Sequence, residues 1–180
     1  MKSTLSITAV IFTFGFVSLP IAFSDSDYRK HQSTGVIAVN NPLYMEECGS
    51  CHMAYSPGLL PSNGWTKLML GLEDHFGDNA ELDAETQQTV TGYLSANSAS
   101  QSDYRRSRKL NQSINPNDVP IRISKIPYFI NKHNEIPDRM VSGNPKVNSL
   151  SHCNSCHTKA EQGSFSEREI DIPDYGEWND

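Results

Sequence analysis

Two five-residue motifs contain every cysteine of this chain. The first runs from Cys48 to His52 and the second from Cys153 to His157, and both have the pattern C-x-x-C-H. This pattern attaches c-type haem, because two thiols about one helical turn apart can form thioethers with the vinyl groups of one porphyrin. The histidine that follows then lies under the iron as its proximal ligand. The sequence therefore predicts two covalent haem c groups, whose thiols are those of Cys48, Cys51, Cys153 and Cys156 and whose proximal ligands are His52 and His157.

Other uses of four cysteines were weighed against haem. Four cysteines in an exported protein can form two disulfides, and two C-x-x-C pairs can bind one zinc ion. A C-x-x-C pair can also serve dithiol redox chemistry. None of these explains a histidine directly after each pair, so haem attachment is the preferred interpretation.

The distal ligands must come from the remaining histidines or from methionine. His75 and His133 follow apolar and aromatic residues at helical spacing, whereas His31 and His152 lie in polar surroundings. His152 also adjoins Cys153, which places it badly for reaching the far face of its own haem. We therefore expect His75 to bind the first iron and His133 the second.

Methionine remains the alternative at both irons. Met69 shares the apolar stripe of His75, and Met140 follows His133 in the chain. A methionine ligand in place of histidine would raise the reduction potential of that haem.

Short helices are expected to position the two motifs. Asn41-Pro42 has the form of an N-cap followed by proline at the first helical position, which predicts a helix that runs into the first motif. Asn144-Pro145 precedes the second motif in the same way. Each motif is therefore expected to end a short helix.

Ser62 is expected to cap the helix with the clearest apolar stripe of the chain. Its apolar stripe consists of Trp65, Leu68, Met69, Leu72, His75 and Phe76. This spacing places all six side chains on one helical face, with Gly77 ending the helix. Asp83 then has the form of an N-cap for a further helix from Ala84 to Ala96.

These elements predict a mainly α protein with two haem domains. A helix ending in C-x-x-C-H, a loop, a ligand-bearing helix and a closing helix form the plan of a class I cytochrome c domain, here over 40–97. Residues 98–117 are interpreted as a linker or surface excursion whose basic run is solvated, with a docking patch for an acidic partner as the alternative. Residues 118–180 are expected to form a smaller, irregular haem domain, with a strand or extended arm near Val119 and a short helix that carries His133.

The N-terminus is typical of an exported protein. Lys2 precedes an uncharged stretch from Leu5 to Phe23, which predicts a signal peptide over 1–24, cut after Ser24. An uncleaved membrane anchor is the alternative. Because c-type haem is attached outside the cytoplasm, the periplasm is the expected location. Residues 25–39 are expected to form a flexible lead-in.

Composition restricts the partners and the fold. The formal net charge of -6 argues against nucleic acid as a partner. Apolar residues make up 37% of the chain, below the roughly 45–50% usual for globular proteins. Two buried porphyrins would supply the missing apolar mass, so the chain without haem is expected to fold poorly.

The expected function is the transfer of single electrons. An iron with two histidine ligands has no coordination position open to a substrate, and paired imidazoles favour the ferric state. The alternative is a dihaem peroxidase or small-molecule reductase, which would need one open haem.

The longer strings around these residues resemble the bacterial dihaem cytochrome c family of small periplasmic electron carriers. The similar segments are 47–55, 59–61, Trp65, 74–77, 127–129, His133 and the second motif. The resemblance implies bis-histidine haems in a class I-like first domain and a less regular second one. It also implies redox partners such as a membrane cytochrome b or an oxygen-binding monohaem cytochrome c.

Overall fold

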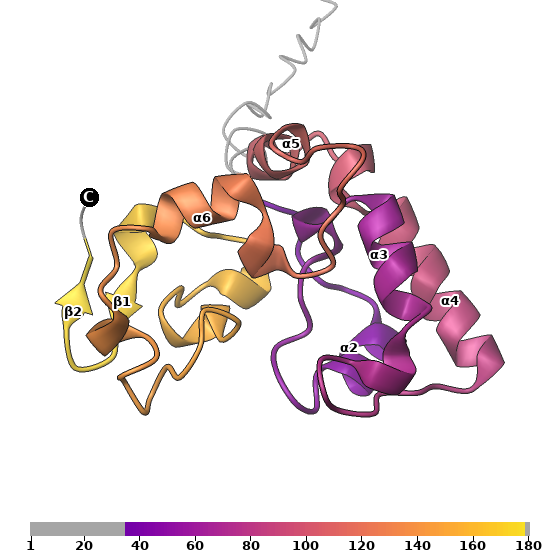
Figure 1. Cartoon of the computed structure of the whole chain (residues 1–180), viewed down its shortest axis with the longest axis horizontal. Coiled ribbons are helices and arrows are strands. Elements are labelled where there is room, and N and C mark those ends of the chain that lie inside the picture. Colours follow the sequence, from indigo (N-terminus) through magenta and orange to yellow (C-terminus); the bar gives the residue numbers. More distant parts are fainter. Residues whose placement is uncertain (1–34, 179–180) are drawn as a thin grey trace, which may run out of the picture.

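A computed structural model describes residues 35–178 of the chain (Figure 1). The predicted signal peptide, His31 and residues 25–34 of the lead-in lie outside the described residues. The α-helices are α2 (Pro42–Cys48), α3 (Ser62–Met69), α4 (Ala84–Ala96), α5 (Arg105–Gln112) and α6 (Pro127–His133). Single 3-10 turns are Pro57–Leu59, Leu72–Asp74, Ala99–Gln101, Ile123–Lys125, Asp138–Met140, Cys153–Ser155, Ala160–Gln162 and Glu167–Glu169.

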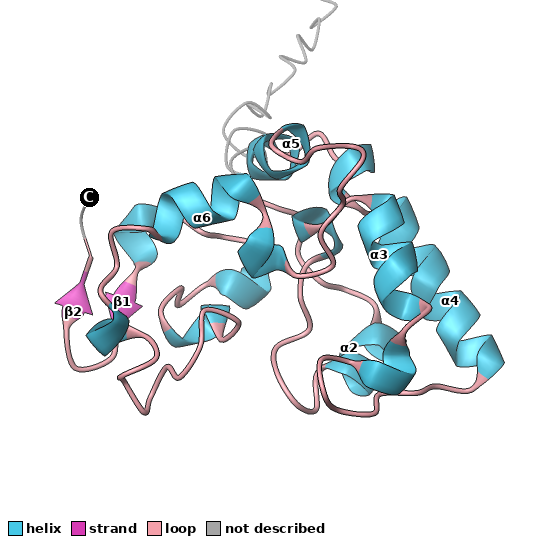
Figure 2. Cartoon of the chain, in the orientation of Figure 1, coloured by secondary structure: helices cyan, strands magenta, loops and turns pink. Residues whose placement is uncertain are grey.

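The described part of the chain is mainly helical, as the sequence predicts. Its only described sheet is the antiparallel pair β1 (Asp171–Ile172) and β2 (Gly176–Glu177), in which Ile172 faces Gly176. Figure 2 shows that long loops join the helices, most of all in the C-terminal half. In Figure 1, α2, α3 and α4 form one end of the molecule, α5 and α6 span its upper side, and the strands lie at the other end.

The helix before the first motif is confirmed. The Oδ1 atom of Asn41 accepts a hydrogen bond from the backbone N–H of Tyr44 at 2.9 Å, and Pro42 occupies the first helical position. The helix α2 ends at Cys48, with Gly49 as its C-cap. The first cysteine is therefore the last helical residue.

The helix predicted before the second motif is wrong. Residues 141–151 form turns, and Cys153–Ser155 is a single 3-10 turn. Asn144 is 3% exposed, and its side chain accepts from the N–H of Lys146 while donating to the carbonyl of Pro173. Its amide thus closes a local turn instead of starting a helix. The left-handed φ of 63° at Asn148 also interrupts any helix toward Cys153.

The helix predicted from Ser62 to Phe76 is shorter than expected. Ser62 is its first residue and not its N-cap, because Pro61 holds the cap position without a side-chain hydrogen bond. The helix ends at Met69, and Gly71 has the non-helical dihedrals φ -123° and ψ 32°. A 3-10 turn follows, and Phe76 adopts a φ of 64°. The prediction that His75 lies on this helix is wrong, because His75 is the C-cap of the 3-10 turn that follows the helix. The α4 helix has the predicted bounds, with Asp83 accepting from two backbone N–H groups.

The helix α5 was not expected from the sequence. This helix lies within the segment interpreted as a linker, and it buries Ser107 and Leu110. Arg105 and Arg108 are exposed, as the solvated interpretation requires, but Arg106 is half-buried. The helix packs against α6.

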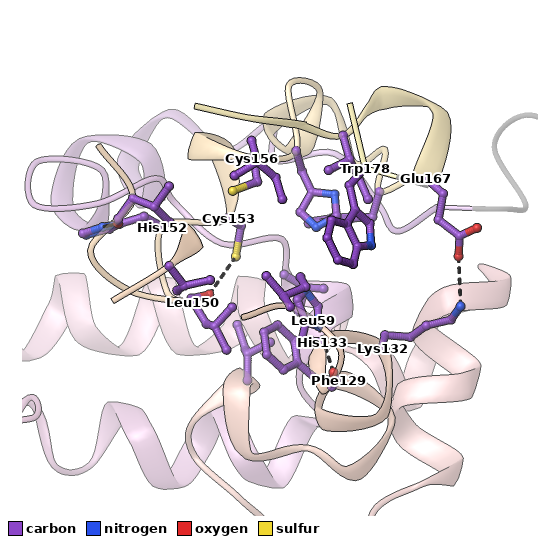
Figure 3. Close-up of a pocket in the computed structure, with 18 of the residues that line it drawn as sticks. Leu59, Phe129, Lys132, His133, Leu150, His152, Cys153, Cys156, Glu167 and Trp178 are labelled. Atoms are coloured by element: carbon purple, nitrogen blue, oxygen red, sulfur yellow. Dashed lines mark hydrogen bonds and ion pairs between the residues drawn. The ribbon is translucent and has the colours of Figure 1, made fainter. Parts of the chain in front are cut away.

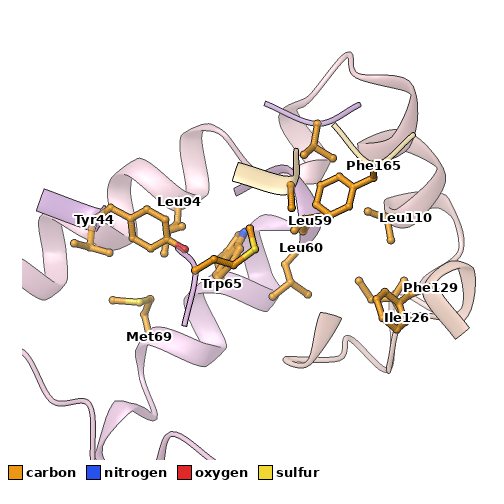
Figure 4. Close-up of a cluster of buried hydrophobic side chains, with 14 of the residues drawn as sticks. Tyr44, Leu59, Leu60, Trp65, Met69, Leu94, Leu110, Ile126, Phe129 and Phe165 are labelled. Carbon is orange, nitrogen blue, oxygen red and sulfur yellow. The ribbon is translucent and has the colours of Figure 1, made fainter. Parts of the chain in front are cut away.

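One cluster of buried apolar side chains runs through both halves of the chain (Figure 4). It extends from Tyr44 to Phe165 and includes Leu60, Leu94 and Ile126, each 0% exposed.

The first described residues join the same core. Val36 is 3% exposed, and its N–H donates to the carbonyl of Gly163 at 2.9 Å. Residues 35–39, which fall within the predicted flexible lead-in, are thus tied to the C-terminal half.

No helix within residues 35–178 is long and apolar enough to cross a membrane.

Candidate haem sites

Each C-x-x-C-H motif lies at the wall of its own cavity. The first cavity holds the motif from Cys48 to His52 together with His75, and apolar side chains such as Trp65 and Leu68 line the rest. The second holds the later motif together with His133 (Figure 3). Its walls are completed by Leu59, Leu110, Ile136, Val147, Phe165, Ile172 and Trp178. The structure thus brings all eight predicted site residues together as two groups of four.

The first cavity contains two imidazoles that face each other. The ring centres of His52 and His75 are 6.3 Å apart, and the ring planes make an angle of 31°. His52 Nδ1 donates to the carbonyl of Met53 at 2.8 Å, which leaves Nε2 available to a metal. Tyr55 stacks on His52 with ring centres 4.6 Å apart.

The second cavity repeats the arrangement with different supports. The ring centres of His133 and His157 are 6.1 Å apart, with an interplanar angle of 71°. His133 Nδ1 donates to the carbonyl of Phe129 at 2.8 Å, and the Phe129 ring lies flat against it at 3.9 Å. Phe165 packs against His157 with ring centres 5.2 Å apart.

Both distances fit one metal ion between the rings. Metal–imidazole bonds are about 2.0–2.1 Å long, so the centres of two rings bound to one ion lie roughly 6 Å apart. The cavities thus offer what haem c needs, which is two thiols with an adjacent imidazole in an apolar enclosure, and each cavity adds a second imidazole.

The alternative ligands lie in different places relative to the cavities. Met69 lines the first cavity and is 2% exposed, but Met140 is not among the residues that line the second. His152 lines the second cavity, where its Nδ1 hydrogen-bonds to the carbonyl of Val147.

The surroundings of two predicted ligands, His75 and His157, favour the neutral imidazole. Burial, then His133 and then Arg106, lower the pKa of His157 to about 4. The pKa of His75 is lowered by burial, then by His52 and Arg122. A metal binds the neutral imidazole, so both shifts favour the form that a haem iron needs. Burial is also the largest cause that raises the pKa of the Cys153 thiol to about 11.

The two cavities share one wall. Ile123, Phe129, Leu150 and Cys153 line both of them. The Tyr55 hydroxyl also donates to the carbonyl of Ser151 at 2.6 Å, which joins the first motif's loop to the second motif. The two sites are therefore neighbours within one core.

Sequence reasoning missed three supporting residues. Tyr55 follows the first motif closely, but its stacking on His52 depends on the path of the loop. Phe129 precedes His133 by one helical turn, a spacing that could have suggested their contact. Arg106 precedes the buried Leu110 by one helical turn on α5. This spacing was hidden by the basic residues around Arg106.

Comparison with known proteins agrees with this geometry. Residues 44–165 match the family model of dihaem cytochrome c. The chain belongs to the dihaem cytochrome c family. Proteins of this family carry two covalently bound haem c groups and transfer electrons through them, and this chain supplies the cysteines for both at C-x-x-C spacing.

Solved structures of the family resemble this chain along most of its length. The dihaem cytochrome c of Shewanella baltica OS155 is 41% identical, with a TM-score of 0.64 over 77% of this chain and 98% of that one. The dihaem cytochrome c of Rhodobacter sphaeroides is also 41% identical, with a TM-score of 0.64 over 72% of this chain and 100% of that one. A search among curated proteins found no match.

Proposed function

We propose that this dihaem cytochrome c is a periplasmic electron carrier in which both haem irons have two histidine ligands. The observation that carries the proposal is the pair of opposed imidazoles in each cavity, 6.3 Å apart for His52 and His75 and 6.1 Å apart for His133 and His157. Each haem, when bound, supplies an iron that gains and loses one electron.

The protein's own residues hold the ligands in place. The carbonyls of Met53 and Phe129 each accept a hydrogen bond from an imidazole Nδ1. This bond orients the ring and makes its other nitrogen a more basic metal ligand. Tyr55 and Phe129 stack on these rings and exclude water from one face. If both histidines of a cavity held the iron, no coordination position would be left for a substrate.

The domain division and the partners form part of the same proposal. Residues 40–97 would form a class I-like domain around the first site, and 118–180 a smaller domain around the second. The signal-like residues 1–24 support export to the periplasm. There the protein would exchange electrons with a membrane cytochrome b or an oxygen-binding monohaem cytochrome c.

Electron paramagnetic resonance of the oxidised protein tests the ligation. The iron signal depends on the angle between the two axial imidazole planes, which is 31° at the first site and 71° at the second. We expect two distinct low-spin signals, with the more anisotropic one from the second site. A high-spin signal, or a methionine-to-iron charge-transfer band in the near infrared, would contradict the proposal.

Intact-mass measurement tests stoichiometry and export together. The purified protein should carry two haems and begin at Asp25. Peroxidase turnover by the unmodified protein would favour an enzyme with one open haem instead.

A further inference from the structure

Arg106 differs from the other basic residues of α5. Arg105, Arg108 and Lys109 are exposed, whereas Arg106 is half-buried and lines the second cavity. It is the one arginine among the described residues that line this cavity.

The guanidinium of Arg106 is only partly satisfied. One of its terminal nitrogens, Nη2, donates to the carbonyl of Phe165 at 2.9 Å. Its Nε is buried and has no hydrogen-bond partner within the described part of the chain. A buried donor without a partner is costly, and the cost is larger when the group is charged.

No carboxylate of the described residues balances this charge. The cavity's other basic side chain is that of Lys132, whose Nζ pairs with Glu167 at 2.9 Å. Glu167, the acidic residue that lines the cavity, is thus already engaged. The ionisable neighbour of Arg106 is His157, an imidazole, which cannot neutralise a cation.

A haem brings the missing anion, because each porphyrin carries two propionate carboxylates. Arginine is suited to them, since its planar fork donates two parallel hydrogen bonds to a carboxylate. We infer that Arg106 binds a propionate of the haem attached to Cys153 and Cys156. This inference rests on the second haem site as proposed above.

The position of Arg106 has a consequence for the second iron. A fixed positive charge beside the site disfavours the additional charge of ferric iron, so it raises that haem's reduction potential. Among the described residues that line the first cavity, the one arginine is Arg122, which is exposed and stacks on the Phe76 ring at 3.7 Å. Arg106 should therefore act on one haem of the two.

The test compares Arg106→Gln with Arg105→Gln, which removes an exposed charge from the adjacent position of the same helix. Both reduction potentials are measured by spectroelectrochemistry, and the propionate bending modes by resonance Raman spectroscopy. A His133→Met variant shows which of the two measured potentials belongs to the second haem, because a methionine ligand raises the potential of that haem. Arg106→Gln should lower the second potential and shift a propionate mode, while Arg105→Gln should change neither.

Two results would overturn the inference. In the first, Arg106→Gln leaves both the second reduction potential and the propionate spectrum unchanged. In the second, Arg106→Gln shifts the reduction potentials of both haems equally. If Arg106→Gln does not mature, Arg106→Lys carries the test: it keeps the charge but loses the fork, so it should shift the propionate mode with a smaller fall in potential. An unchanged mode in Arg106→Lys would also overturn it. Intact mass and the resonance spectra of the parent test the haem site itself independently.

Discussion

The ring of His133 is fixed from two directions at once. Phe129 lies flat against it at 3.9 Å and also provides the carbonyl that accepts from Nδ1. If His133 binds the second iron, as proposed above, a ring held this rigidly would need no rearrangement when the iron changes charge. His75 is held differently, by its position between the ring of Phe76 at 4.8 Å and a backbone bridge to Asp78.

Replacing His133 with alanine should open the second iron. The cavity would then face the metal without a distal side chain, so the oxidised variant should be partly high-spin and the reduced variant should bind carbon monoxide. Absorption spectra with and without carbon monoxide measure both effects. His152→Ala is the control and should behave as the parent; carbon monoxide binding by that variant would place the ligand at His152 instead.

Ionisation of the buried Tyr44 hydroxyl should lower the free energy of unfolding at high pH. Burial is the main cause that raises its pKa well above the usual value, and its hydroxyl donates to the carbonyl of Tyr55 at 2.8 Å. Because the folded pKa is raised, this contribution is complete below the unfolded pKa of about 10 and is lost as pH rises toward the folded pKa.

Unfolding free energies measured from neutral pH to strongly alkaline pH check this expectation. Tyr44→Phe should cost about 1 kcal/mol at neutral pH, the net contribution of one hydrogen bond. Above pH 10, the unfolding free energy of Tyr44→Phe should also fall less steeply than that of the parent. The two slopes should differ by up to about 1.4 kcal/mol per pH unit. Parallel curves for the two proteins would show that Tyr44 does not titrate in this range.

At the scale of elements, local chemistry predicted helix starts better than helix ends. Asn41-Pro42 and Asp83 start helices because their side-chain oxygens meet free backbone N–H groups a few residues on. The end of α3 depends on Gly71, whose weak helix preference competes with an apolar stripe that continues past it. The same Asn-Pro pair forms a turn at 144 because Asn144 is buried against the C-terminal hairpin's loop.

The N-cap of α2 should contribute measurably to stability. Asn41→Ala removes the acceptor for the Tyr44 N–H, so it should destabilise the protein by about 1 kcal/mol. Asn41→Asp keeps the acceptor and should restore most of this loss. Denaturant unfolding of the haem-loaded proteins measures both, and equal losses in the two variants would assign the effect to something other than capping.

Across the whole molecule, the haem chemistry could be predicted from sequence and the closure of the fold could not. The motifs are local, so their spacing alone carries the chemistry. The contact of Val36 with Gly163 joins distant residues through backbone atoms, which no side-chain pattern reveals. The helix α5 joins the core through Ser107 and Leu110. These are the two buried residues of a very polar helix, too few to form a recognisable apolar pattern.

The close approach at Gly163 should not tolerate a side chain. Gly163 has a φ of 79°, and an added Cβ would overlap the carbonyl oxygen of Val36. Gly176 has a nearly equal φ of 82° with nothing within 4 Å of its added Cβ, so it is a matched control. Gly176→Ala should cost about 1–2 kcal/mol from backbone strain alone.

Gly163→Ala should cost clearly more, because it adds a clash with rigid backbone to the same strain. Denaturant unfolding of the two haem-loaded variants compares them directly. Equal losses would show that the N-terminal segment can move away from Gly163 without cost.

The shared wall between the cavities also sets an order of events during biosynthesis. A chain made only as far as Cys51 and His52 already contains the first attachment site, whereas Phe129, Leu150 and Cys153 are added later. Until then the first cavity lacks one side, and a porphyrin can reach its thiols without any opening of a finished fold. The segment that carries the second haem motif also supplies residues that line the first cavity, so the first site would be complete only once that segment has been added.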